Sequence, residues 1–297
     1  MDWTALLAAF GGGMWGASIG AVPAFIFTGI LAIVGGVAAL TGHGEVVGIA
    51  FGPVFGPHIS FGGGVAAAAF AGSRGFLETG RDIGTPLMGL KRVDVLFVGG
   101  AFGALGYLLN AGLTRAGAGH WTDTIAVTVI LTAMVARLVF GKTSLIGTVA
   151  SPNGRRFRPD DSAKWVAWQQ DLSHVLSIGL AVGLMAAFLA SGSGMTAGSD
   201  ALAFGIATTV LIFMVLGRSV PVTHHIALPA ALGVLHGAGF IGGAACGVAG
   251  ALLGEAASRI FLIHGDTHID PPAAGIAGVV LVLKVATALG WISGMAA

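Results

Sequence analysis

Long apolar stretches, separated by short polar connections, make up most of the chain. A membrane-spanning helix needs about 20 mainly apolar residues. Eight stretches are close to this length, and they are 4–22, 24–42, 93–114, 122–140, 171–190, 200–217, 239–263 and 272–292. Two further apolar stretches, 46–72 and 219–236, are interrupted by proline and glycine. The pattern predicts an all-α polytopic membrane protein with eight transmembrane helices and two Gly/Pro-broken segments.

The chain divides into two halves of the same plan. Residues 141–170 form the one long polar stretch that resembles a linker, and they lie in the middle of the chain. Residues 1–140 before it and 171–297 after it each contain four predicted spans and one broken segment. We therefore expect a first membrane repeat, a cytoplasmic linker and a second membrane repeat in tandem.

The two broken segments share a short motif. Residues 52–64 read GPVFGPHISFGGG, and residues 220–230 read VPVTHHIALPA. In each, Pro-Val is followed after a short gap by His-Ile, which places His58 in the first segment and His225 in the second. Duplicated halves with Gly/Pro-broken segments in matching positions are typical of transporters whose binding site lies between the halves.

A second pattern recurs at the last predicted helix of each half. Arg137 follows Asp123 at the same spacing at which Lys284 follows Asp270. Each aspartate is expected to cap a helix N-terminus, where negative charge is favourable. The two basic side chains either extend to the membrane interface or form a cationic site that attracts an anion or compensates a buried acid.

The distribution of basic residues predicts the topology. Lys and Arg are concentrated in loops 73–92 and 141–170, whereas 191–200 and 264–270 contain none. Because positive residues favour the cytoplasm, the first two loops are expected inside and the last two outside, with both termini cytoplasmic. This arrangement requires that the broken segments are re-entrant, which gives parallel repeats. The alternative is ten spans with inverted repeats.

Composition supports a location in a membrane. The chain is 55% hydrophobic and 9% charged, compared with about 25% charged residues in a soluble domain. The net charge of +1 gives no basic surface for a nucleic acid. The single cysteine, Cys246, excludes an internal disulfide. No basic residue precedes the first apolar run, so we expect a multi-pass plasma-membrane protein without a cleaved signal peptide.

Histidines in the broken segments are the first candidates for chemistry. An ionisable side chain inside a membrane is costly and indicates a functional site. His58, His224 and His225 can each pass a proton or bind a polar solute, because neutral imidazole both donates and accepts. The alternative is that they hold the broken segments in place through hydrogen bonds. The other residues of these segments that we expect to line the pathway are Pro53, Pro57, Pro221, Gly62 and Gly63.

Three charged residues are further candidates for the pathway. Glu45 precedes the first broken segment, and Lys284 lies deep in the last predicted span. Glu255 either takes part in a proton relay or forms an ordinary helix pair with Arg259, which is four residues later.

The segment HGDTHIDPP contains alternating histidines and aspartates. In an extended chain, His264, Asp266, His268 and Asp270 would point to one side. Imidazole and carboxylate ligands suit a divalent metal. The alternative is an exposed polar turn.

The sequence has no HExxH, CxxC or P-loop motif. We therefore expect no catalytic activity and no cofactor, and any transport should be passive, coupled to an ion gradient or driven by a separate subunit. The predicted function is a channel or secondary transporter for a small polar solute or ion, with a pathway between the repeats lined by 52–64 and 220–230. The alternatives are a non-transporting membrane subunit or scaffold of a larger complex, and an intramembrane enzyme. The expected partners are the lipid bilayer, the solute, further copies of this chain in a homo-oligomer and a partner membrane subunit.

Overall fold

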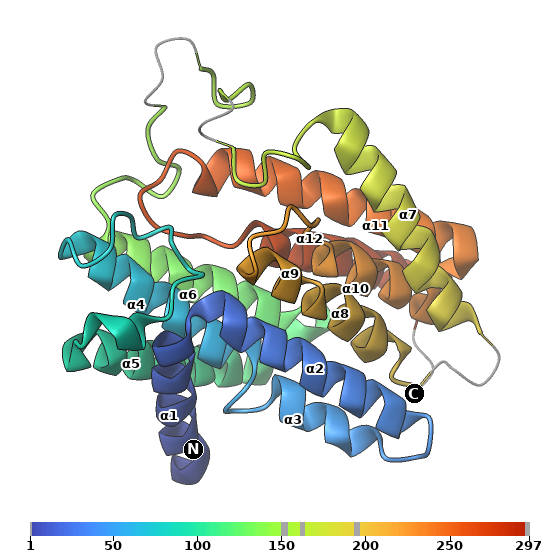
Figure 1. The fold of residues 1–297 in the computed structure, drawn as a ribbon. Helices are drawn as coiled ribbons and strands as arrows, with labels where there is room; N and C mark the ends of the chain where they lie inside the picture. Colours follow the sequence, from blue (N-terminus) through green and yellow to red (C-terminus); the bar gives the residue numbers. More distant parts are fainter. Residues whose placement is uncertain (1, 150–153, 161–163, 193–196, 295–297) are drawn as a thin grey trace.

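The computed structural model describes residues 2–149, 154–160, 164–192 and 197–294. Regular structure in these ranges is helical, and β-pairing is limited to the isolated bridges Gly80–Thr267 and Arg155–Arg158. In the same ranges, the helices long and apolar enough to cross a membrane are Ala21–Ala39, Val93–Arg115, Leu172–Ser191, His224–Leu262 and Pro271–Ala288. The predicted all-α class is confirmed (Figure 1).

Parts of two predicted polar segments are not described. Residues 150–153 and 161–163 of the predicted linker, and residues 193–196 of the predicted loop 191–200, lie outside the described residues.

The first half begins with two helices that match predicted spans. α1 (Trp3–Ile19) and α2 (Ala21–Ala39) are separated only by Gly20. Gly20 has a φ of 92°, and this conformation is available at little cost only to glycine. A single glycine therefore allows the chain to turn from α1 into α2.

The predicted break in 46–72 lies between two short helices and a longer one. η1 (Gly44–Val46) and α3 (Val47–Phe51) pack back on α2. Residues 52–56 are not helical, and the π-helical turn η2 (Pro57–Phe61) then leads directly into α4 (Gly62–Ser73). Pro57 begins η2, a position where proline costs no hydrogen bond.

The first half ends with two more predicted spans. A 3₁₀ turn, η3 (Leu87–Leu90), precedes α5 (Val93–Arg115). A second turn, η4 (Ala118–His120), connects α5 to α6 (Thr124–Phe140).

The second half has the same kind of elements with a different break. Residues 216–223, at the start of the predicted broken segment, are not helical, whereas Pro229 lies within a helix. Gly237 has a φ of 86° and separates that helix from the next. The elements are α7 (Leu172–Ser191), α8 (Ser199–Thr209), α9 (Leu211–Val215), α10 (His224–Gly233), η6 (Val234–Ala238), α11 (Gly239–Ala257), η7 (Ser258–Leu262) and α12 (Pro271–Ala288).

Glycines allow the long helices to approach closely within each half. α1 packs against α5, and α7 packs against α11. A Cβ on Gly13 would overlap the carbonyl oxygen of Gly99, and a Cβ on Gly183 would lie 2.8 Å from the carbonyl oxygen of Ala244. In lipid, such close backbone packing replaces the hydrophobic force that joins helices in water.

The broken segments are held by two further glycine contacts. A Cβ on Gly106 of α5 would overlap the carbonyl oxygen of His58, and a Cβ on Gly250 of α11 would overlap that of His225. In both halves, the histidine backbone therefore lies directly against a long helix.

The two most extensive helix contacts between the halves are both antiparallel. α2 packs against α8, with Gly29 beside Thr208 and Gly36 beside Leu202. α6 packs against α12, and the end of each helix lies beside the start of the other, because Arg137 donates to Thr267 and Lys284 donates to the carbonyl oxygen of Gly119.

Arg137 connects the end of α6 to the other half. Its side chain is completely buried. Its Nε donates to the Thr267 hydroxyl at 2.8 Å, and its Nη1 donates to the Leu145 carbonyl oxygen at 2.8 Å. The carbonyl oxygens of Phe261 and Thr267 accept further hydrogen bonds from it. A guanidinium side chain has five donors, so these acceptors make burial tolerable, and the Arg137 side chain does not extend to the surface of the protein.

The segment 264–270 does not lie where the charge distribution predicted. Thr267 pairs with Gly80, and the amide of Thr148 donates to the carbonyl oxygen of His264 at 2.8 Å. The segment thus contacts both loops 73–92 and 141–170 instead of lying on the opposite side. The physical reason is that η7 extends α11 as far as Leu262, which brings the following residues to the linker.

The start of α1 lies at the end of the bundle away from loop 73–92 (Figure 1). α1 is antiparallel to α5, because Ala17 lies beside Gly99 while Ala9 lies beside Gly103. Since α5 begins directly after loop 73–92, α1 begins far from that loop. This arrangement differs from the shared side that the sequence predicted for the termini and the basic loops.

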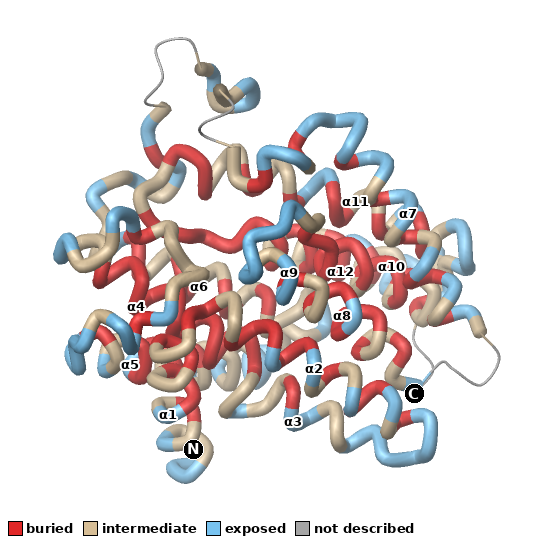
Figure 2. The backbone as a smooth tube through the Cα atoms, in the orientation of Figure 1, coloured by how far each residue is buried: buried red, intermediate tan, exposed pale blue. Residues whose placement is uncertain are grey.

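The outer faces of the helices are apolar. Figure 2 shows buried segments concentrated inside the bundle and exposed ones along its outside. Large apolar side chains remain on that outside, such as Phe188 at 69% exposure and Val282 at 64%. Such a surface suits a lipid environment.

The glycine contacts generate a stability prediction. Gly106→Ala should lower the melting temperature of the purified protein in detergent, because overpacking costs about 1–3 kcal/mol. Gly112→Ala is the matched control in the same helix, since nothing lies within 4 Å of its added Cβ. Alanine at that position should be neutral or stabilising. Equal melting temperatures for the two variants would contradict the proposed role of the close contact.

Candidate functional site

A cavity of about 310 Å³ lies between the two halves of the chain. Residues from α2, η2 and α6 line it from the first half, and residues from α8, α10 and α12 line it from the second. Val215 and the loop residues 81–84 also contribute, so the lining extends to the exposed surface. The volume is at the lower end of the range for small-molecule sites, which is about 300–1,000 Å³.

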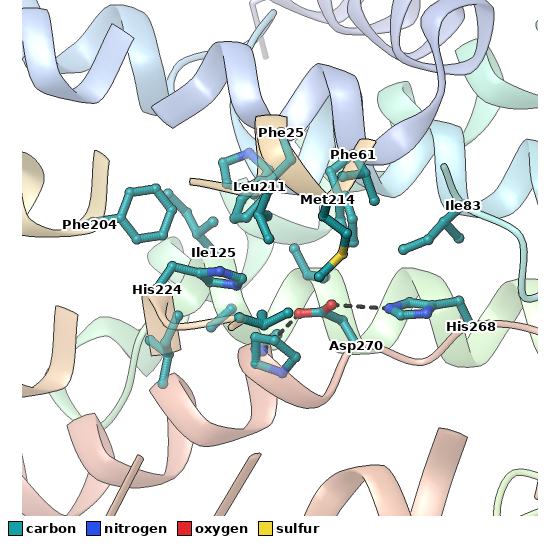
Figure 3. Close-up of a pocket in the computed structure, with 18 of the residues that line it drawn as sticks. Phe25, Phe61, Ile83, Ile125, Phe204, Leu211, Met214, His224, His268 and Asp270 are labelled. Carbon is teal, nitrogen blue, oxygen red and sulfur yellow. Dashed lines mark hydrogen bonds and ion pairs between the residues drawn. The ribbon is translucent and has the colours of Figure 1, made fainter. Parts of the chain in front are cut away.

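Aromatic side chains form much of the wall. Phe25 lies at the centre, with its ring centroid 5.3 Å from that of Phe61 and 5.7 Å from that of Phe204. Figure 3 shows these rings on one side of the cavity and Asp270 with His268 on the other. The wall is therefore amphipathic, with one aromatic side and one polar side.

His224 is the polar residue that α10 contributes. It is the first residue of the helix, and it follows an extended strip that Gln169 holds in place. Gln169 accepts from the amide of Val222 at 2.8 Å and donates to its carbonyl oxygen at 3.0 Å. The His224 ring packs 4.8 Å from the Phe25 ring, and its buried Nδ1 has no hydrogen-bond partner.

Two aspartates line the cavity and cap helices at the same time. Asp123 accepts from the amide of Ala126 at 2.7 Å, at the start of α6. Asp270 accepts from the amide of Ala273 at 2.8 Å, at the start of α12, and contacts Nε2 of His268 at 3.1 Å. The predicted capping role is confirmed for both. Asp123 was not among the site residues predicted from the sequence, although its match to Asp270 was a usable signal.

The other two predicted pathway histidines are buried away from this cavity. His58 and His225 are 3% and 2% exposed. Neither side chain is among the cavity-lining residues, and Nδ1 of each has no hydrogen-bond partner. They lie behind the wall, where their carbonyl groups meet Gly106 and Gly250.

The remaining residues of the broken segments have different positions. Pro57 lines the cavity, whereas Pro221 lines a separate apolar pocket of about 170 Å³. Gly63 packs against α1 and α5, and Gly62 lies near the hydroxyl of Thr132. Pro53 does not line either cavity.

The three charged residues predicted to line the pathway do not line the central cavity. Glu45 is exposed and lies 3.4 Å from His43. Glu255 forms the ordinary helix pair with Arg259. Lys284 donates to the carbonyl oxygen of Gly119. None of the three lines the central cavity.

The four alternating residues of 264–270 take separate partners. His264 lies 3.2 Å from the carbonyl oxygen of Arg156, and Asp266 accepts from the hydroxyl of Thr143 at 2.7 Å. Burial opposes ionisation of Asp266, but hydrogen bonds from Lys142 and Thr143 outweigh it and hold its pKa below the usual value. Among the described residues, no group of three or more His, Cys, Asp or Glu is arranged to hold a metal ion.

The apolar helices and the cavity between them are consistent with a multi-pass α-helical membrane protein. A family described as a family of unknown function (DUF7973) matches residues 1–155 and, a second time, residues 151–296. The chain belongs to this family. No curated protein and no solved structure matches it.

The capping aspartates generate a second prediction. Asp270→Ala should lower the melting temperature of the purified protein, because loss of a helix cap costs about 0.5–2 kcal/mol. Asp270→Asn should retain most of the stability, since the amide oxygen can still accept from Ala273. The same order is expected for Ala and Asn at Asp123. If Asn were as destabilising as Ala, charge rather than capping would be the structural contribution.

Proposed function

We propose that this protein is a channel or secondary transporter for a small polar solute or ion, with its pathway through the cavity between the halves. The observation that carries the proposal is the composition of the cavity wall. Both predicted broken segments contribute to it, through Pro57 and Phe61 in one half and His224 and Leu228 in the other. Non-helical backbone at membrane depth is tolerated where it lines a cavity or is buried in protein.

We further propose that the halves are inverted repeats. The double match of the family to the two halves supports a repeat. The antiparallel α2–α8 and α6–α12 pairs support inversion, because a two-fold axis in the membrane plane makes equivalent helices antiparallel. Parallel repeats would make them parallel.

Reciprocal contacts support the same relation. Arg137, near the end of α6, donates to Thr267 just before α12. Lys284, near the end of α12, donates to Gly119 just before α6. Each half thus uses the basic residue of its last helix to bind the segment before the last helix of the other half.

The inverted arrangement gives ten crossings, the alternative that the sequence left open. α3, η2 and α4 together form one broken crossing in the first half, and α10 with η6 forms its counterpart. The basic residues then fall almost entirely at one end of the bundle, in agreement with the positive-inside rule. Those at that end are Arg74, Arg81, Lys91, Arg92, Arg137, Lys142, Arg155, Arg156, Arg158, Lys164, Arg218 and Arg259.

The transport proposal is tested by filling the cavity. Leu228→Trp should abolish flux in proteoliposomes, because the larger side chain occupies the space between the halves. Leu180→Trp is the control, since Leu180 lies on the outer face of α7 with 51% exposure. Flux is measured by stopped-flow light scattering for a panel of small solutes and by an internal pH dye for protons, amines and acids.

Two results would count against transport. If the wild-type protein moved nothing in the panel, the non-transporting subunit would become the better explanation. If Leu228→Trp transported as well as Leu180→Trp, the pathway would lie elsewhere.

The ten-crossing arrangement predicts sidedness. In a Cys246→Ala background, His43→Cys and Glu78→Cys both place a thiol at an exposed position. An impermeant maleimide should label the first in intact cells and the second only after permeabilisation, because one broken crossing separates them. With a re-entrant segment, both positions would show the same accessibility.

A further inference from the structure

The central cavity contains more negative than positive charge. Asp123 and Asp270 both line it, and in the part of the chain that the structure describes neither forms an ion pair with a lysine or arginine. Arg81 also lines the cavity, but its guanidinium group points to the carbonyl oxygen of Ile263 at 3.5 Å. The side chain of His268 contacts Asp270 at this wall, and it is charged only when protonated.

The helix N-termini at the cavity do not favour an anion. A free helix N-terminus carries roughly half a positive charge and binds anions through its amides. At α6 and α12 these amides are already used, because Asp123 and Asp270 accept hydrogen bonds from Ala126 and Ala273. At Asp270, a full carboxylate charge exceeds the half charge of the helix, so the field around this residue stays negative.

An independent polar group also indicates a ligand. His224 is 4% exposed and lines the cavity, and its Nδ1 has no hydrogen-bond partner. In Figure 3 its ring extends towards the space beside Asp270. A buried polar atom without a partner is costly, so a ligand that donates a hydrogen bond to this nitrogen would be stabilised.

The aromatic wall, which lies across the cavity from Asp270 and His268 (Figure 3), suits an apolar or cationic group. Phe25, Phe61 and Phe204 present aromatic rings to the cavity, and aromatic faces attract cations. A volume of about 310 Å³ limits the occupant to a small molecule.

We propose that the cavity binds a protonated amine with a compact apolar body, an inference that rests on the transport function proposed above. The ammonium group donates to the carboxylates of Asp123 and Asp270 and to Nδ1 of His224. The apolar body packs on Phe25 and its neighbouring rings. This is the solute class that the protein carries.

The experiment uses three probes of nearly equal shape and different charge. Neopentylamine is cationic at neutral pH, neopentyl alcohol is neutral and pivalate is anionic. Binding to the full-length protein in lipid nanodiscs is measured by titration calorimetry. Neopentylamine should bind at least about tenfold more tightly than neopentyl alcohol, because its hydrogen bonds are charge-assisted. Pivalate should not bind.

Variants locate the binding site. Asp123→Asn and Asp270→Asn keep the helix caps but remove the charge, and each should weaken neopentylamine binding by about tenfold. Asp94→Asn is the control, since Asp94 is exposed and pairs with Arg92 outside the cavity. It should bind neopentylamine as the wild type does.

The results separate this inference from the proposed function. The ligand class is overturned if neopentylamine does not bind, if pivalate or the alcohol binds as tightly, or if both Asn variants bind normally. Flux of an anion without flux of the amine would overturn the ligand class but leave transport intact. Binding of neopentylamine that depends on the aspartates, with no flux of any solute, would retain the binding site and overturn transport.

Discussion

The helices and the broken segments pack together through close backbone contacts at glycine positions, and the rest of the arrangement follows from these contacts. The carbonyl group of His58 lies directly against Gly106, and the carbonyl group of His225 lies directly against Gly250. A bilayer gives helices no hydrophobic reason to associate, so association depends on close packing and buried polar contacts. These two contacts fix the broken segments against α5 and α11. Their fixed position places Pro57 and His224 at the wall of the central cavity.

Buried polar contacts between the halves complete this arrangement. Arg137 has four protein acceptors around its guanidinium group, and removing them would leave a buried charge unsatisfied. Asp123 and Asp270 each have two roles, because each carboxylate caps a helix and also lines the cavity. Structural and chemical roles are therefore concentrated in few side chains, as expected in a chain with 9% charged residues.

Local features were predictable from the sequence where neighbouring residues decide them. The predicted spans 93–114 and 171–190 correspond to α5 and α7 within one or two residues. The caps at Asp123 and Asp270 and the pair of Glu255 with Arg259 depend only on residues within one helical turn, and all three form. Glu45 is exposed and does not line the central cavity, because nearness in sequence to a broken segment does not determine which way a turn faces.

The amino-acid sequence alone indicated a membrane protein and located the long helices, because hydrophobicity, glycine and proline act locally. Which residues come into contact depends on how the helices pack in three dimensions. His224 rather than its neighbour His225 faces the cavity, since successive residues of a helix point about 100° apart and packing selects one of them. Segment 264–270 lies against the linker although it contains no basic residue, because the length of α11 with η7 determines where it emerges. Charge patterns cannot show such long-range geometry, since it depends on how far each helix extends and which neighbour it packs against.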